Sequence, residues 1–223
     1  MTGLSDADRE QVVRFQDSCA IVQLPMTVVE QEMVSKVLHK LARSPDYKGK
    51  VKAWFDLLVV RLCKFLTSRA DLAVIKGHYK YLSKVKDRSK LPHESELQLD
   101  LADYLRSALA TVLMEVPSVG GGRTDIYVPM DGFRFIIEVK RTTATEWSCY
   151  SVRPHSLQAS AYGVADVRLG VLATLDLSVR PPGTPHVTEC FGVIRRRPSR
   201  TDERTIVFMR VGGNRSTPSS ASH

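Results

Sequence analysis

The sequence has no long apolar run, no closely spaced cysteines and no long repeat, and each absence narrows the possible classes of protein. No stretch of about 18 or more uninterrupted apolar residues occurs, which argues against a membrane-spanning helix. Residues 1–16 are too charged for a secretory signal peptide, so a cytoplasmic location is expected. The four cysteines are far apart and form no C-x-x-C pair, so neither a zinc site nor a disulfide framework is expected.

The composition is that of an ordinary globular protein. The chain has 223 residues, enough for one or two domains with a proper core, and 43% of its residues are hydrophobic. The tail at 212–223 is rich in serine and glycine, and we expect it to be disordered.

Positive charge is concentrated in the N-terminal part of the chain. Residues 1–90 carry a net charge of +7, whereas residues 91–223 carry +1. Within 76–86, lysines alternate with aromatic residues, a composition that suits a nucleic-acid backbone and its bases. The alternative is a solvated, lysine-rich helix face with Tyr79 or Tyr81 half buried.

Two acidic residues stand out in a pair of predicted strands. Successive side chains on a strand point to opposite faces, so Glu138 and Lys140 should emerge side by side on one face of the segment 133–140. The segment 125–128 is short, apolar and β-prone, and the turn residues that follow it predict a hairpin. This hairpin would bring Asp125 close to Glu138.

Two carboxylates at short range predict a bound cation, because each opposes ionisation of the other unless their charge is neutralised. Oxygen ligands suit Mg²⁺ or Mn²⁺, which use few protein carboxylates and keep positions for water and phosphate oxygens. Such an ion can activate a water for attack on a phosphodiester. Lys140 could then orient that water or stabilise the charge that develops on the phosphate.

These residues resemble the motifs of the PD-(D/E)XK nuclease superfamily, which has the restriction-endonuclease-like fold. The resemblance covers about residues 91–211, with Asp125 at the first acidic position and Glu138-Val139-Lys140 as the E-x-K motif. It implies that the Val139 carbonyl also binds the metal. Gln158 and Tyr162 resemble the Q-x-x-x-Y helix motif of one branch of the superfamily and would share one helix face near the site.

The family often has a further acid on an upstream helix, and two glutamates compete for this role. Leucines recur every four residues from Leu97, and a step of three back along this stripe reaches Glu94. Glu96 is expected to face solvent with Asp100 and Asp103. Glu94 is therefore the preferred candidate, and Glu96 the alternative.

The predicted fold class is α/β, with a mixed central sheet flanked by helices and preceded by an N-terminal helical domain. We expect a basic helical domain over 1–90, a nuclease domain over 91–211 and a disordered tail over 212–223. Within the first domain, 26–41, 52–66 and 68–86 have helical patterns; in the second, 167–177, 189–195 and 205–211 are candidate strands. The helical domain would either pack on the catalytic unit or cover it as a lid.

The sequence thus predicts a Mg²⁺-dependent nuclease, with DNA the favoured substrate by analogy and RNA left open. Endonuclease and exonuclease action are not distinguished. The expected nucleic-acid contacts are Lys76, Lys80, Lys84, Lys86, Arg123, Arg141 and Arg153. Two alternatives are a catalytically silent nuclease fold that binds DNA or supports an assembly, and a defence effector regulated by a partner. Homodimers are common in the superfamily, so the resemblance leaves both a homodimer and a regulatory protein partner open.

Overall fold

The computed structural model describes residues 25–72, 77–109, 111–119, 122–144, 167–180, 185–197, 200 and 202–215. Its helices are α2 (Val28–Leu41), α3 (Gly49–Ala70) and α4 (Glu94–Ala108), with short 3-10 helices η1 (Gly77–Leu82), η2 (Arg88–Lys90) and η4 (Val187–Glu189). Its strands are β1 (Leu113–Val119), β2 (Gly122–Met130), β3 (Phe133–Thr142), β4 (Leu169–Asp176), β5 (Phe191–Arg196) and β6 (Arg204–Gly212).

The strands form one mixed sheet in the order β1-β2-β3-β4-β6-β5. The first three strands are antiparallel neighbours, β3, β4 and β6 run parallel, and β5 pairs with β6 in the antiparallel direction. The mixed sheet flanked by helices confirms the expected α/β class. The predicted hairpin of β2 and β3, the buried strand β4 and the antiparallel pair of β5 and β6 are all present.

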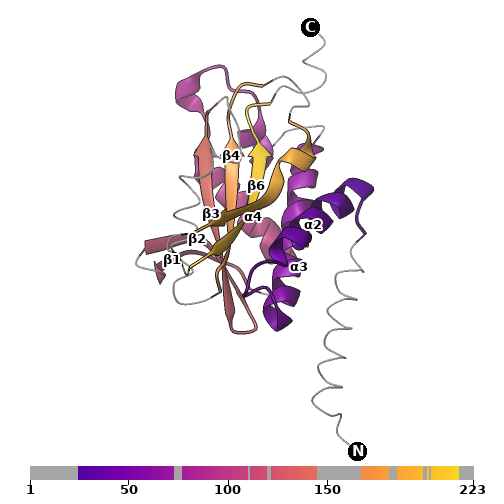
Figure 1. The fold of residues 1–223 in the computed structure, drawn as a ribbon. Coiled ribbons are helices and arrows are strands. Elements are labelled where there is room, and N and C mark those ends of the chain that lie inside the picture. The colour runs from indigo at the N-terminus through magenta and orange to yellow at the C-terminus, as the bar shows by residue number, and fades with distance from the viewer. Residues whose placement is uncertain are drawn as a thin grey trace, which may run out of the picture.

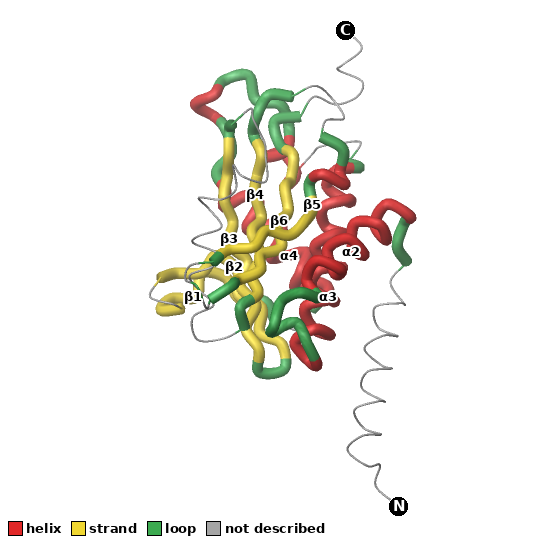
Figure 2. The backbone as a smooth tube through the Cα atoms, in the orientation of Figure 1, coloured by secondary structure: helices red, strands yellow, loops and turns green. Residues whose placement is uncertain are grey.

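One face of the sheet packs against the helices. We call it the helix face; it carries the apolar side chains Phe135, Ile137, Val139, Val171, Ala173, Val207 and Met209. α3 packs on β6, α2 on β5, and α4 on β3 and β2. In Figures 1 and 2, α4 lies behind the sheet and α2 and α3 lie beside it.

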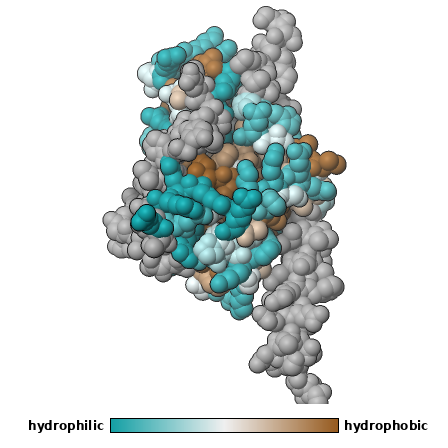
Figure 3. Space-filling model, viewed as in Figure 1, coloured by the Kyte–Doolittle hydropathy of each residue, from teal (hydrophilic) through white to brown (hydrophobic). Residues whose placement is uncertain are grey.

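The other face, here called the site face, is turned toward the viewer in Figure 1. It carries Glu138 and Lys140 of β3, together with a small apolar cluster of Leu172, Ile194, Ile206 and Phe208. Figure 3 shows apolar atoms gathered in the middle of this face, among hydrophilic atoms. The alternation of strand side chains therefore separates the main core from the candidate site.

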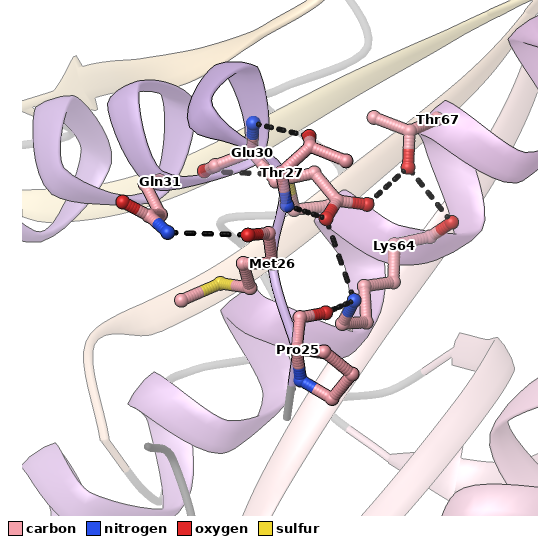
Figure 4. Close-up of polar contacts among 8 residues, drawn as sticks. Pro25, Met26, Thr27, Glu30, Gln31, Lys64 and Thr67 are labelled. Atoms are coloured by element: carbon pink, nitrogen blue, oxygen red, sulfur yellow. Dashed lines mark hydrogen bonds and ion pairs between the residues drawn. The ribbon is translucent and has the colours of Figure 1, made fainter. Parts of the chain in front are cut away.

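α2 is anchored to α3 at its first turn by a buried acid (Figure 4). Thr27 and Glu30 form a capping box, in which the Thr27 hydroxyl accepts from the Glu30 amide and the Glu30 carboxylate accepts from the Thr27 amide. The same carboxylate accepts from the Thr67 hydroxyl at 2.7 Å and lies 3.4 Å from the Lys64 ammonium. This acid therefore joins the two N-terminal helices.

A second buried acid joins α3, η1 and α4. Asp100 accepts from Arg69 Nε and Nη2, both at 2.7 Å, and from the Tyr81 hydroxyl at 2.7 Å. The sequence placed Asp100 on a solvent face with Glu96 and Asp103, and this expectation was wrong. The i to i+4 step from Glu96 suggested one exposed face, but α3 and η1 cover α4 at Asp100.

The N-terminal helices pack onto the unit that contains the sheet, which is one of the two arrangements that the sequence left open. Side chains from α2 and α3 belong to the same apolar core as those of the helix face. The rings of Phe55 on α3 and Phe135 on β3, for example, lie 5.2 Å apart. The domain boundary at residue 90 itself stays a prediction.

Three parts of the structure differ from the expected elements. α3 ends at Ala70, and only the short η1 follows it within 77–86, starting at Gly77 with a φ of +59°. β1 was not predicted. Residues 212–215 were assigned to the disordered tail, and this was wrong. Gly212 is the last residue of β6, Gly213 donates to the Asp176 carbonyl, and Arg215 donates to the carbonyls of Leu82, Arg69 and Ala70.

The structure bears on two expectations from the sequence, one about membrane-spanning helices and one about the cysteines. Within the described parts of the chain, no helix combines the length and apolar character that a membrane crossing requires. Cys63 and Cys190 are free, buried thiols, and burial raises the pKa of Cys63 to about 12 and that of Cys190 to about 11. These two cysteines are thus core residues.

Candidate active site

The structure brings Asp125 and Glu138 together on the site face. The antiparallel pairs of β2 and β3 run from Met130 and Phe133 to Ile126 and Ile137, and Asp125 and Glu138 are the next residues on the two strands. The Asp125 carboxylate accepts from the Val139 amide at 2.7 Å. Asp125 therefore holds β3 through its side chain where the ladder of backbone pairs ends.

α4 holds Asp125 from the other side. Gln98 is buried on α4, and its Nε2 donates to the Asp125 carbonyl at 2.9 Å. A polar residue beside Leu97 in the apolar stripe of α4 is the sequence signal for this contact, but the sequence alone does not reveal its partner. The side chain of Asp125 is thus placed by contacts from β3, and its backbone by a contact from α4.

Glu138 is a buried acid with an incomplete set of partners. It is 1% exposed, and its Oε1 lies 2.6 Å from Lys140 Nζ. Its Oε2 is also buried and has no hydrogen-bond partner among the residues that the structure describes. Because a buried carboxylate oxygen is costly without a partner, this position favours a bound cation or a polar ligand.

Lys140 lies between the two acids. Its ammonium is 2.6 Å from Glu138 Oε1 and 3.9 Å from Asp125 Oδ2. Burial opposes the charged form of Lys140, but Glu138, Asp125 and Glu94 outweigh this effect and raise its pKa. Lys140 is therefore protonated over the neutral range and acts as a cation rather than as a base.

The pKa of Glu138 is raised above its ordinary value. The main cause is burial; the hydrogen bond and charge of Lys140 act in the opposite direction, and the charges of Asp125 and Glu94 raise the pKa further. An acid with a raised pKa beside a specific charged partner is typical of functional sites. Burial therefore opposes the charged form of Glu138, and a bound cation would favour that form.

Glu94 is near enough to act on this site electrostatically. It is the first residue of α4, partly buried, and its charge raises the pKa of both Glu138 and Lys140. Glu96 is exposed, and it is not among the main causes of the pKa shift of either residue. The structure therefore places Glu94, the preferred helix acid, on the side of α4 that is closer to the site.

The ligand set is small. In the described ranges, no three histidine, cysteine, aspartate or glutamate side chains lie close enough together to form a metal-binding group. The donors that remain are the carboxylates of Asp125 and Glu138, with the Val139 carbonyl implied by the resemblance. This set fits Mg²⁺, which is commonly held by one or two carboxylates and keeps several waters.

A basic segment crosses the carboxyl ends of the parallel strands. This strap, residues 83–92, is held at one end by the Val85 amide, which donates to Asn214 Oδ1. At the other end, Arg141 at the end of β3 donates to the Pro92 carbonyl at 3.1 Å. Ligands of sheets with parallel strands commonly bind at the carboxyl ends of those strands, and Figure 1 shows the strap above β3 and β4.

The structure describes only some of the residues that are expected to contact nucleic acid. Lys80, Lys84, Lys86 and Arg141 are exposed, and the last three lie on or beside the strap. Tyr81 is buried and hydrogen-bonded to Asp100, so it is not available to stack on bases. The side chain of Arg123 lies outside the described residues, as do Lys76, Arg153 and both residues of the helix motif, Gln158 and Tyr162.

The sequence analysis missed a second buried ion pair on the site face. Asp176, at the end of β4, accepts from Arg210 Nε at 2.8 Å and lies 3.3 Å from Arg180 Nε. Arg210 is 1% exposed, and burial lowers its pKa despite the charge of Asp176. The available signal was a charged residue within or at the end of each apolar run, in 169–176 and 205–211.

The chain was compared with known proteins. No protein-family model, no curated protein and no solved structure matches the chain.

Proposed function

We propose that this protein is a Mg²⁺-dependent nuclease that hydrolyses phosphodiester bonds in DNA. The observation that carries the proposal is the geometry around Glu138: a buried carboxylate with one oxygen lacking a described partner, next to Asp125 and Lys140. An acid in such a position is suited to hold a divalent cation, and the adjacent lysine is suited to act on a phosphate.

The two acids and the lysine would have different roles in the proposed reaction. Asp125 and Glu138 would hold Mg²⁺, which Mn²⁺ could replace, with the Val139 carbonyl and Glu94 as further candidates. When bound, the ion would polarise the phosphodiester and lower the pKa of a bound water. Lys140 would place its positive charge beside the phosphate and stabilise the negative charge that develops there.

The order of the elements supports this proposal. An acid-bearing helix, α4, precedes three antiparallel strands, and the second and third of these carry Asp125 and the E-x-K motif. The strand that follows, β4, then pairs in parallel with β3. The helix acid, the strand acid and the E-x-K motif come in the order that the resembling superfamily uses, and we propose a restriction-endonuclease-like core on that basis.

The strap supports a polyanionic substrate. Exposed Lys84, Lys86, Arg88 and Lys90 stand against the single acid Asp87. Because the strap lies over the carboxyl ends of β3 and β4, a nucleic-acid backbone bound along it would pass close to Lys140. DNA is proposed ahead of RNA on the resemblance alone.

A cleavage assay on four substrates would test the proposal. Linear duplex DNA, circular plasmid, single-stranded DNA and RNA would be incubated with Mg²⁺, Mn²⁺ or EDTA, using wild type and Asp125→Asn. We expect metal-dependent cleavage by wild type and at least a 100-fold loss in the variant, about the effect of removing one key electrostatic group. Circular plasmid would show whether the action is endonucleolytic.

Glu94→Gln and Glu96→Gln form a matched pair for the helix acid. The proposal expects a loss of activity in Glu94→Gln and near wild-type activity in Glu96→Gln. DNA binding without cleavage by the wild type in any metal would instead favour the catalytically silent, DNA-binding subunit.

A further inference from the structure

Three residues of adjacent parallel strands form a polar row on the site face. Lys140 of β3 is in register with Thr174 of β4, and Thr174 is in register with Arg210 of β6. In-register neighbours on parallel strands project from the same face and lie about 4.8 Å apart. The row therefore extends the candidate active site from Lys140 across two more strands.

Thr174 is the middle residue of this row. It is 1% exposed, and its hydroxyl has no hydrogen-bond partner among the described residues. Both neighbours in the row are donors only, because an ammonium and a guanidinium have no acceptor atom. The Thr174 oxygen is thus an acceptor without a described donor beside two cations, whereas most buried hydroxyls in folded proteins are hydrogen-bonded.

The two cations differ in their present partners. Arg210 donates to the Asp176 carboxylate through Nε and Nη2, a buried pair that holds its guanidinium. Lys140 lies against Glu138 Oε1 and near Asp125 Oδ2, the two carboxylates that the proposed function assigns to the metal. A divalent cation at these oxygens would compete with the Lys140 ammonium for them.

We infer that Thr174 is a positioning residue whose hydroxyl accepts a hydrogen bond from the Lys140 ammonium when a divalent cation binds Asp125 and Glu138. This inference rests on the proposed function. The hydroxyl offers the displaced ammonium a hydrogen bond on the same face, one strand away, while Arg210 is retained by Asp176. Lys140 then stays beside the metal position, where it can act on the phosphate.

Removal of the Thr174 hydroxyl should therefore weaken metal binding without harming the fold. The experiment compares Thr174→Val and Thr174→Ala, which lack the hydroxyl, with Thr174→Ser, which keeps it. Thr205→Val is the matched control, because Thr205 is also a buried threonine whose hydroxyl lacks a described partner. It lies at the start of β6, beside Leu169, and therefore at the opposite end of the sheet from Thr174. Mn²⁺ alone is titrated into each full-length protein by calorimetry.

We expect the Kd for Mn²⁺ to rise about 10-fold or more in Thr174→Val and Thr174→Ala, the range for a hydrogen bond to a charged group. Thr174→Ser and Thr205→Val should keep the wild-type Kd. The rise in Tm on addition of Mn²⁺ should shrink in the same two variants, whereas the Tm in EDTA should stay at or above that of wild type in each variant that lacks a hydroxyl.

The outcomes separate this inference from the proposed function. If wild type binds Mn²⁺ and cleaves DNA, and Thr174→Val and Thr174→Ala do the same with unchanged Kd, the inference is wrong and the proposed function stands. An equal loss in Thr205→Val would show a general packing effect and would also overturn the inference. If wild type itself neither binds Mn²⁺ nor cleaves any nucleic acid, both fail.

Discussion

Glu138 is buried and has a raised pKa, so its ionisation lowers the stability of the folded protein. A carboxyl whose pKa is higher in the folded than in the unfolded protein stabilises the fold below its unfolded pKa. That stability is lost as the pH rises through the folded pKa. Ionised Glu138 is therefore expected to destabilise the metal-free protein at neutral pH, as acids at functional sites commonly do.

Replacement of Glu138 by glutamine tests this cost. Glu138→Gln mimics the protonated acid, so we expect its Tm in EDTA to exceed that of wild type at pH 7. The difference should be about 2–4 °C for each kcal/mol of stability gained, and it should vanish below the ordinary glutamate pKa of 4.5. Thermal melts from pH 4 to pH 8 provide the measurement.

Addition of Mg²⁺ should reverse the order of the two proteins, because only wild type has the carboxylate that the ion would use. If Glu138→Gln instead melts below wild type at every pH in EDTA, the ion pair with Lys140 stabilises the fold and the cost assigned to Glu138 is absent.

Asp100 presents the contrasting case of a buried acid whose partners are complete. It accepts from Arg69 twice and from Tyr81 once, and burial together with the Asp100 charge raises the pKa of Tyr81. Removing one partner of a buried ion pair typically costs about 3–5 kcal/mol. We expect a loss of this size for Asp100→Asn, measured by urea denaturation.

The control for Asp100 lies on the same helix. Asp103 pairs with Arg106 at the surface, where its side chain is 72% exposed, and Asp103→Asn should cost less than about 1 kcal/mol. Equal effects of the two substitutions would contradict the structural role assigned to the Asp100 pair.

At the scale of elements, the strap is the structure's main candidate for contact with nucleic acid. Neutralising one phosphate contact lowers the slope of log K against log salt concentration by about 0.9 for duplex DNA. The double substitution of Lys84 and Lys86 by glutamine should therefore reduce this slope by about 1.8. Fluorescence anisotropy with labelled duplex DNA in EDTA, at several salt concentrations, would measure it.

A double substitution of Lys36 and Lys40 provides the control. Both lysines are exposed on α2, so their replacement removes the same charge at a position away from the strap. A loss of slope in this control equal to that in the strap variant would mean that only net charge matters, which would contradict the role of the strap.

The elements also show which features the sequence could reveal. Regular patterns predicted α2, α4, β4 and the hairpin well, because alternation or helical periodicity is strong in each. β1 escaped because it contains Pro117, has an irregular register near that residue and places Glu115 at a φ of +54°. The extent of the helix after α3 was overestimated, because Gly77 adopts a backbone conformation that a regular helix does not allow.

The site was predictable to the extent that it is local. Asp125, Glu138 and Lys140 are joined by one hairpin, so strand alternation alone placed them together. The contacts of Gln98 with Asp125 and of Arg210 with Asp176 join segments distant in sequence. No short-range pattern encodes such contacts, and the buried state of Asp100 was missed for the same reason.

At the scale of the whole molecule, the N-terminal helices and the sheet share one apolar core. We therefore expect residues 91–215 alone not to fold, since the helix face would lose the cover of α2 and α3. The full chain should unfold in one cooperative transition. Calorimetry and circular dichroism of both proteins would measure this, and a folded 91–215 fragment that binds Mn²⁺ would contradict it.

The central claim concerns Lys140, because an ion pair with Glu138 alone would also serve a purely structural role. The most direct measurement is the rate of plasmid cleavage in Mg²⁺ by wild type and Lys140→Ala, with DNA binding measured beside it in EDTA. We predict that Lys140→Ala binds DNA within a few-fold of wild type and loses at least about 100-fold in cleavage rate. Equal cleavage by both proteins would contradict the assignment of Lys140, and the absence of cleavage by wild type would contradict the proposed activity.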